Sequence, residues 1–348
     1  MGFELNKSYS GFRLTKKEEI AEIKSLGLFF EHDVTGAELL VLENDDDNKV
    51  FSATFRTPPE NDTGIAHILE HSVLCGSKNF PVKEPFVELM KGSLQTFLNA
   101  MTFPDKTMYP VASRNRKDFF NLMNVYLDAV FYPNISEETF KQEGWHYELN
   151  TPEDKIVYKG VVLNEMKGEF SSPESCIDRQ LAHSLFPSTP YGYESGGDPK
   201  CIPDLTYADF KDFHKKHYHP SNSRLFLYGD GDTQSYLEFL QEKYLQDFGH
   251  MDVNTSIAHQ RSFRKPKRKS LSYPVSSHES LEKKTFVLVG YKLDKAINHE
   301  HCLGFSILSH LLLGSSASPL RKALITSEFG SEVIGGGFDD NRADQIFA

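Results

Sequence analysis

The sequence predicts an α+β fold in which an antiparallel sheet is packed with helices. Runs of alternating or continuous apolar residues, such as residues 50–56, are typical of strands. Residues 95–102 and 106–111 follow each other closely enough to form a pair of strands. Residues 119–131 carry apolar side chains at helical spacing, which indicates a helix with one face in the core.

The amino-terminal segments complete the expected sheet. Residues 16–26 are predicted to form an amphipathic helix, and residues 28–32 and 38–42 to form strands. The acidic residues 43–48 are expected to be the turn of a hairpin that leads into the strand at 50–56. A calcium loop is the weaker alternative, because the run lacks the glycine and the distal glutamate of an EF-hand.

A predicted helix at residues 64–76 carries the main candidate for chemistry. Asp62 and Thr63 can cap its start, and Gly76 can end it. Because an α-helix has 3.6 residues per turn, His67 and His71 lie on one face.

Glu70 lies beside the two histidines, so two imidazoles and one carboxylate point toward the same place. This H-x-x-E-H spacing suits a catalytic zinc, which needs nitrogen ligands, a third ligand, and a carboxylate to take a proton from water. About 0.04 such motifs are expected by chance in a chain of this composition, so surface residues or a structural cluster are the weaker alternatives.

A second helical segment, residues 161–170, places Glu165 and Glu169 on one face. Either carboxylate could complete a metal site with His67 and His71. From the residues alone, a glutamate on a helix is usually a solvated surface residue.

Length and charge limit the classes of function. The 348 residues, 39% of them hydrophobic, suggest two domains, and the net charge of −11 argues against nucleic acid or an anionic membrane as partner. The four cysteines lack C-x-x-C spacing, which favours reduced thiols. No apolar run approaches the ~20 residues of a membrane span. We therefore predict a soluble, cytoplasmic protein, with an organellar matrix as the alternative, that starts near its natural beginning.

His214, His217 and His219 form a second histidine cluster. The lysines between them would repel a cation, so structural histidines are favoured over a second metal site.

Several further segments occur together with the motif helix, in the order found in one known family. The sequence resembles the pitrilysin/insulinase-type zinc metalloproteases, and within them the presequence protease (falcilysin-like) branch, over most of its length. The resemblance is carried by residues 67–77, 97–100, 142–145, 158–168, 195–199 and 218–222.

The resemblance implies a specific site. It selects Glu165 rather than Glu169 as the third zinc ligand beside His67 and His71, and it makes Glu70 the catalytic base. It also implies that Asn99 and Ala100 belong to an edge strand to which an extended peptide substrate adds by main-chain hydrogen bonds. An ordinary sheet edge is an equally weighted alternative at this position.

The resemblance also implies a domain order. Residues 1–260 would form the zinc peptidase domain. The basic, proline-containing composition of residues 261–272 by itself predicts an exposed linker, and a nucleic-acid patch is the minor alternative. Residues 273–348, with a strand at 284–291 and helices at 301–313 and 319–328, would begin a second, inactive homologous domain that is truncated here. In such enzymes a carboxy-terminal half closes a chamber and supplies an arginine and a tyrosine to the substrate. That half would be the missing partner.

The predicted function is zinc-dependent endoproteolysis of unstructured peptides, weak or absent in this chain alone. A catalytically silent, processing-peptidase-like scaffold that binds peptides is the alternative, and the intact H-x-x-E-H set opposes it. A metal hydrolase that acts on other substrates is a third reading, which the motif leaves open.

Overall fold

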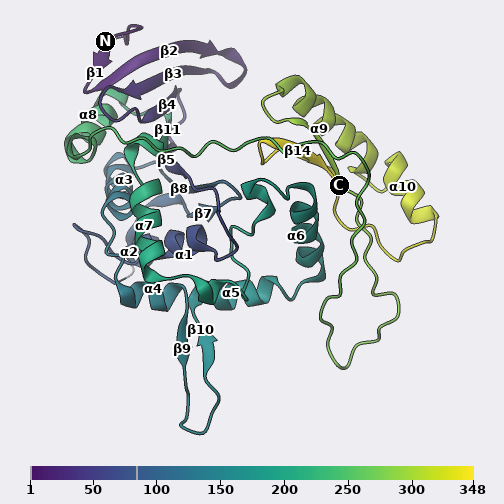
Figure 1. The fold of residues 1–348 in the computed structure, drawn as a ribbon. Coiled ribbons are helices and arrows are strands. Elements are labelled where there is room, and N and C mark those ends of the chain that lie inside the picture. The colour runs from purple at the N-terminus through teal and green to yellow at the C-terminus, as the bar shows by residue number, and fades with distance from the viewer. Residues whose placement is uncertain (1, 84) are drawn as a thin grey trace. The chain divides into compact units, whose positions relative to one another are not determined.

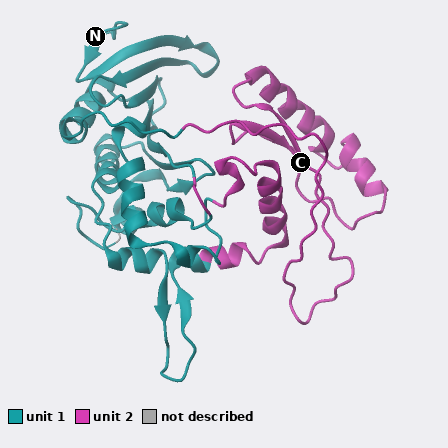
Figure 2. Ribbon diagram, viewed as in Figure 1, with its two compact units in different colours: residues 1–58, 62–164, 195–255 teal, residues 59–61, 165–194, 256–348 magenta. Residues whose placement is uncertain are grey.

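The computed structural model describes residues 2–83 and 85–348 (Figure 1). They form two compact units (Figure 2). Unit 1 contains residues 1–58, 62–164 and 195–255, and unit 2 contains residues 59–61, 165–194 and 256–348. The division between the units falls inside helix α5 (Val161–Glu169), whose residues up to Asn164 belong to unit 1 and whose residues from Glu165 on belong to unit 2. The domain order expected from the sequence stays a prediction.

Unit 1 is built on a nine-stranded sheet with the order β1-β2-β3-β4-β11-β5-β8-β6, and β7 also pairs with β8. Neighbouring strands are antiparallel except for β4 and β11, which are parallel. The strands are β1 (Ser8–Tyr9), β2 (Phe12–Ile20), β3 (Ser25–His32), β4 (Glu38–Glu43), β5 (Lys49–Arg56), β6 (Gln95–Leu98), β7 (Met101–Thr102), β8 (Lys106–Ser113) and β11 (Ser223–Gly229). The predicted α+β class and the pairing of residues 95–102 with 106–111 are confirmed.

The hairpin expected around residues 43–48 is wrong. Strand β11 lies between β4 and β5. Its residue Leu225 pairs with Leu39 of β4 on one side and with Ala53 of β5 on the other. The acidic loop therefore crosses two strand spacings, roughly 10 Å, rather than making a tight turn. The inserted strand comes from far along the chain, so no local pattern could reveal it.

The helix expected at residues 16–26 is also wrong. Strand β2 runs through the charged residues and pairs with β3, for example Lys17 with Leu28 and Glu19 with Leu26. Lysine and glutamate favour helices intrinsically, but here their side chains stay in solvent while the backbone completes the sheet. Long-range pairing overrides the local preference.

The helices of unit 1 place the candidate site against the sheet. Helix α1 lies against β7 and β8, and packs with α4 and α7. Helix α3 packs on β8 and β5, with Leu122, Tyr126 and Val130 fully buried, which confirms the helix predicted at residues 119–131. The helices are α1 (Ile65–Val73), α2 (Pro85–Gly92), α3 (Arg116–Phe131), α4 (Glu137–Glu143), α7 (Tyr207–His217) and α8 (Thr233–Lys243). A separate hairpin, β9 (His146–Glu148) and β10 (Val157–Lys159), extends away from the sheet (Figure 1).

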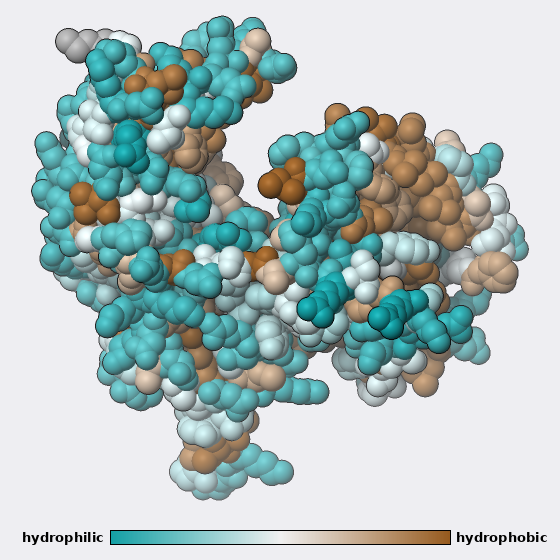
Figure 3. Space-filling view, turned by 45° about the horizontal axis from the view of Figure 1, so that its top comes forward, coloured by the Kyte–Doolittle hydropathy of each residue, from teal (hydrophilic) through white to brown (hydrophobic). Residues whose placement is uncertain are grey.

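Unit 2 has a small core around Phe186, Tyr191 and Ile346. Its elements are α6 (Pro173–Leu185), β12 (Tyr291–Lys295), α9 (His299–Leu313), α10 (Pro319–Thr326), β13 (Phe338–Asp339) and β14 (Asp344–Phe347), and its sheet has the order β12-β14-β13. The strand expected at residues 284–291 is wrong, because strand pairing starts only at Tyr291. Hydrophobic side chains gather on the surface of unit 2 in Figure 3, where α9 and α10 expose Leu303, Ile307, Leu311 and Leu324.

Within the part of the chain that the structure describes, no helix is both long and apolar enough to cross a membrane.

Candidate metal centre

Helix α1 presents two histidines to one place. Its buried face, which includes Ile68, Leu69 and Val73, anchors it in unit 1. His67 and His71 lie one turn apart, and their ring centroids are 5.0 Å apart with an edge-on angle of 77°. The packing of the apolar face thus fixes the direction of both imidazoles.

The start of α1 differs from the expectation. The N-cap is Gly64, in a left-handed conformation (φ 67°), so neither Asp62 nor Thr63 occupies the cap position expected from the sequence. A Cβ atom at Gly64 would lie 2.6 Å from the carbonyl oxygen of Gly196. The helix therefore begins at a backbone contact that only glycine allows.

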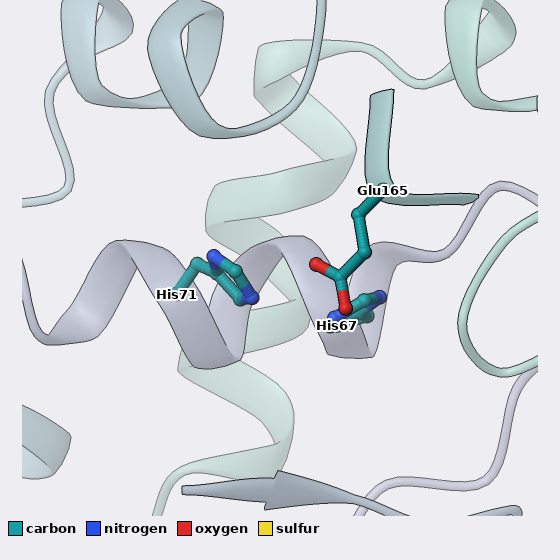
Figure 4. Close-up of side chains that lie close together, drawn as sticks. All are labelled: His67, His71 and Glu165. Carbon is teal, nitrogen blue, oxygen red and sulfur yellow. The ribbon is translucent and has the colours of Figure 1, made fainter. Parts of the chain in front are cut away.

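Glu165 approaches the two histidines from α5. One possible ligand atom from each of His67, His71 and Glu165 lies within 4.8 Å of the others (Figure 4). The histidines are partly buried and Glu165 is exposed. Glu169, the alternative weighed from the sequence, accepts a hydrogen bond from Ser175 at 3.2 Å.

Each imidazole has an acceptor at its Nδ1 atom. For His67 the acceptor is the carbonyl oxygen of Gly196 at 3.1 Å, and for His71 it is a carboxylate oxygen of Glu143 at 3.3 Å. Because neither acceptor carries a proton to donate when Glu143 is ionised, both Nδ1 atoms must donate. The proton-free nitrogen of each neutral ring is then Nε2, as a metal ligand requires. Two such nitrogens and one carboxylate fit zinc.

Glu70 is almost fully buried beside these residues, with 8% of its surface exposed. The hydroxyl group of Thr102, in β7, donates a hydrogen bond to Glu70 Oε2 at 2.7 Å. One carboxylate oxygen is thus held by the sheet. Such an orientation suits a group that must accept a proton at a fixed position.

Asn99 and Ala100 lie at the edge of the sheet, between β6 and β7. The Asn99 amide donates to Pro110 of β8 at 3.2 Å, and the Asn99 carbonyl accepts from the Tyr126 hydroxyl at 3.2 Å. The side-chain oxygen of Asn99 accepts the Ala100 amide at 3.0 Å. These contacts hold the segment in an extended path two residues before Thr102.

Sequence reasoning missed three residues around the site, namely Glu143, Thr102 and the carbonyl of Gly196. Residues 142–145 and 195–199 carry part of the family resemblance, but no spacing rule links them to His67 or His71. Glu143 is buried, which raises the pKa of its carboxyl group, but hydrogen bonds from His71, Gln142 and Cys75 outweigh burial and hold that pKa below its usual value.

The other histidine cluster makes backbone contacts. His214 Nε2 donates to the carbonyl of Val130 at 2.9 Å, and His217 Nδ1 donates to the carbonyl of Arg56 at 3.1 Å. Burial lowers the pKa of His214 to about 4.

Comparisons with known proteins identify the family of the chain. The family model described as "Insulinase (Peptidase family M16)" matches residues 55–169, and that described as "Peptidase M16 inactive domain" matches residues 204–348. Protein HypA of Clostridium perfringens is 52% identical over 349 residues, which cover 100% of this chain and 36% of HypA. Presequence protease 1 of Arabidopsis thaliana, named chloroplastic/mitochondrial, is 51% identical over 95% of this chain and 31% of its own length. The chain thus spans about a third of these relatives.

Two solved structures share the fold. A protease from Helicobacter pylori has a TM-score of 0.63 at 19% identity, covering 90% of this chain and 71% of that one. Pitrilysin has a TM-score of 0.61 at 13% identity, covering 97% of this chain and 35% of that one. These two structures show the fold alone. The two matched family models and the presequence protease relative establish that the chain belongs to the insulinase family of peptidases, M16.

Proposed function

We propose that this chain carries the active site of a zinc-dependent endopeptidase that degrades unstructured peptides. The proposal rests on one observation: possible ligand atoms of His67, His71 and Glu165 lie within 4.8 Å of one another, and the buried Glu70 lies beside the two histidines on α1. His67 and His71 would hold the zinc through Nε2, and Glu165 through its carboxylate. Zinc, when bound, lowers the pKa of water and polarises a carbonyl group.

The remaining steps belong to the side chains of this chain. Glu70 accepts the proton of the attacking water and later returns it to the amine that leaves the cleaved peptide bond. The hydrogen bond from Thr102 keeps the Glu70 carboxylate in one orientation during both transfers. The acceptors at His67 Nδ1 and His71 Nδ1 hold the two rings in the tautomer that binds metal.

The substrate would be a peptide in extended conformation that adds to the sheet edge at Asn99 and Ala100. Main-chain hydrogen bonds of this kind tolerate many sequences. The ordered path of residues 99–102 supports this, because the same segment ends at Thr102, beside Glu70. The remainder of the longer polypeptide would enclose the substrate. The cytoplasmic or organellar location stays a prediction.

The proposed domain order is a peptidase domain at residues 1–260, a linker at 261–272 and the beginning of an inactive homologous domain at 273–348. Support comes from residues 249–290, all of which are described and none of which form a helix or strand. The inactive-domain model, which begins at residue 204, supports the presence of such a domain but not this boundary.

Elemental analysis of purified protein tests the metal site. We expect about one zinc per chain, and loss of zinc in His71→Ala, because a site with three ligands does not survive with two. His310→Ala, at an exposed histidine of α9, is the matched control and should keep its zinc. Full zinc content in His71→Ala would reject the ligand set.

A further inference from the structure

A buried carboxylate outside the ligand set contacts the candidate site from a different helix. Glu143 is the last residue of α4, and 6% of its surface is exposed. Its oxygens lie 3.3 Å from His71 Nδ1, 2.8 Å from Gln142 Nε2 and 3.7 Å from Cys75 Sγ. All three groups can donate a hydrogen bond, so the Glu143 carboxylate accepts at the Nδ1 side of the His71 ring.

The location of Glu143 is fixed by the backbone around it. A Cβ at Gly144 would lie 2.8 Å from the Phe140 carbonyl oxygen and 3.2 Å from Ile68 Cγ2, so α4 ends in close contact with α1. A Cβ at Gly160 would lie 1.9 Å from the Gly144 carbonyl oxygen. Gly160 immediately precedes α5, the helix that carries Glu165. The close approach of two glycines therefore links the end of α4 to the start of the helix that supplies the third candidate ligand.

The two histidines differ in what holds their Nδ1 atoms. His67 donates to a neutral backbone carbonyl, whereas His71 donates to a carboxylate. An anionic acceptor makes the opposite nitrogen of the ring more basic, and it fixes both the tautomer and the ring orientation. A hydrogen bond to a charged group is also stronger than one to a neutral group.

We infer that Glu143 is a positioning residue that holds His71 in its metal-binding tautomer and strengthens His71 Nε2 as a ligand. The inference rests on the proposed zinc site and adds a residue that acts through His71 rather than on the substrate. Gln142 and Cys75 keep the Glu143 carboxylate in place by donating to Oε1.

Zinc affinity, measured by competition with a chromophoric chelator, tests this role without reference to activity. In Glu143→Gln the amide oxygen can still accept from His71 Nδ1 but carries no charge, so we expect zinc affinity to fall about 10-fold. In Glu143→Leu the acceptor is gone, and we expect a loss of about 100-fold. The absorption spectrum of the cobalt-substituted site should change in Glu143→Leu, because the His71 ring loses the acceptor that orients it, and should change much less in Glu143→Gln, which keeps that hydrogen bond.

The matched control is Glu137→Gln, which removes one negative charge from an exposed position on the same helix and should leave zinc affinity unchanged. If Glu143→Leu does not fold, Glu143→Gln decides alone. Wild-type affinity in Glu143→Gln, with zinc binding still lost in His71→Ala, would overturn the role of Glu143 while leaving the zinc site intact. A wild-type chain that binds no zinc would instead overturn the proposed function, and the positioning role with it.

Discussion

Replacing Gly64 by alanine should destabilise the protein and weaken zinc binding together. Gly64 starts helix α1 at φ 67°, and its carbonyl accepts the first helical hydrogen bond, from Ile68, at 2.9 Å. An alanine Cβ there would lie 2.6 Å from the Gly196 oxygen and 2.8 Å from Gly197 Cα. Both neighbours are backbone atoms, so they cannot rotate away as a side chain could.

The magnitude follows from two costs. A left-handed conformation costs a non-glycine residue roughly 1–2 kcal/mol. Forcing extra volume into a packed site costs about 1–3 kcal/mol. Part of the sum is offset, because alanine restricts the unfolded chain by about 0.4–1 kcal/mol. We therefore expect Gly64→Ala to lower the free energy of unfolding by about 1–4.5 kcal/mol.

The same substitution would displace the oxygen that accepts from His67 Nδ1, and zinc affinity should fall about 10-fold. Urea unfolding of the metal-free protein, followed by circular dichroism, measures the first effect, and chelator competition measures the second. Gly92→Ala is the control, since a Cβ there would meet nothing within 4 Å. Unfolding within 0.5 kcal/mol of wild type, together with unchanged zinc affinity, would refute this explanation of the glycine.

Three further outcomes are expected. Thr102→Val should lower kcat about 10-fold with little change in KM or zinc content, because it removes a hydrogen bond to the Glu70 carboxylate, whereas Thr102→Ser should keep the wild-type kcat. Steady-state kinetics of the full-length protein measure this, and an equal loss of kcat in both variants would mean that Thr102 acts through packing instead. The pKa of His214 is about 4 in the folded protein and 6.5 in the unfolded chain, so the unfolded chain binds the proton first and the free energy of unfolding should fall by up to about 3 kcal/mol as the pH drops from 6.5 toward 4. The free energy of unfolding of His214→Gln should depend less steeply on pH over this range, and a slope identical to that of the wild type would contradict the lowered pKa of His214. The chain alone should bind zinc but cleave unstructured peptides about 100-fold more slowly than the full-length protein, because it lacks the hydrogen-bond donors and the enclosing wall that we expect from the rest of the longer polypeptide. Equal peptide turnover per bound zinc would show that the rest of the polypeptide is dispensable.

The sequence predicted the parts of the fold whose causes are local. The apolar spacing around Leu122 and Val130 indicated α3, and the repeat of His67 and His71 along one helix face indicated their approach. Glu165 could be selected only by resemblance, since a glutamate on a helix has no distinguishing pattern of its own.

The errors and omissions have a common cause in long-range pairing. The charged residues of β2 favour a helix when considered alone, but their backbone hydrogen-bonds with β3 and becomes part of the sheet. The insertion of β11 between β4 and β5 depends on Leu225, far along the chain. Glu143 reaches His71 because α4 packs on α1, and Gly64 takes the N-cap position because the backbone of Gly196 lies against it.

Glu70→Gln in the full-length protein tests the central claim most directly. Glutamine keeps the size of the side chain and can still accept the hydrogen bond from Thr102, but it cannot take a proton from water. The variant should keep about one zinc per chain and unchanged unfolding, while cleavage of an unstructured peptide falls by at least about 100-fold. Peptide cleavage at the wild-type rate, with zinc in place, would contradict the assignment of Glu70 as the base and with it the proposed mechanism.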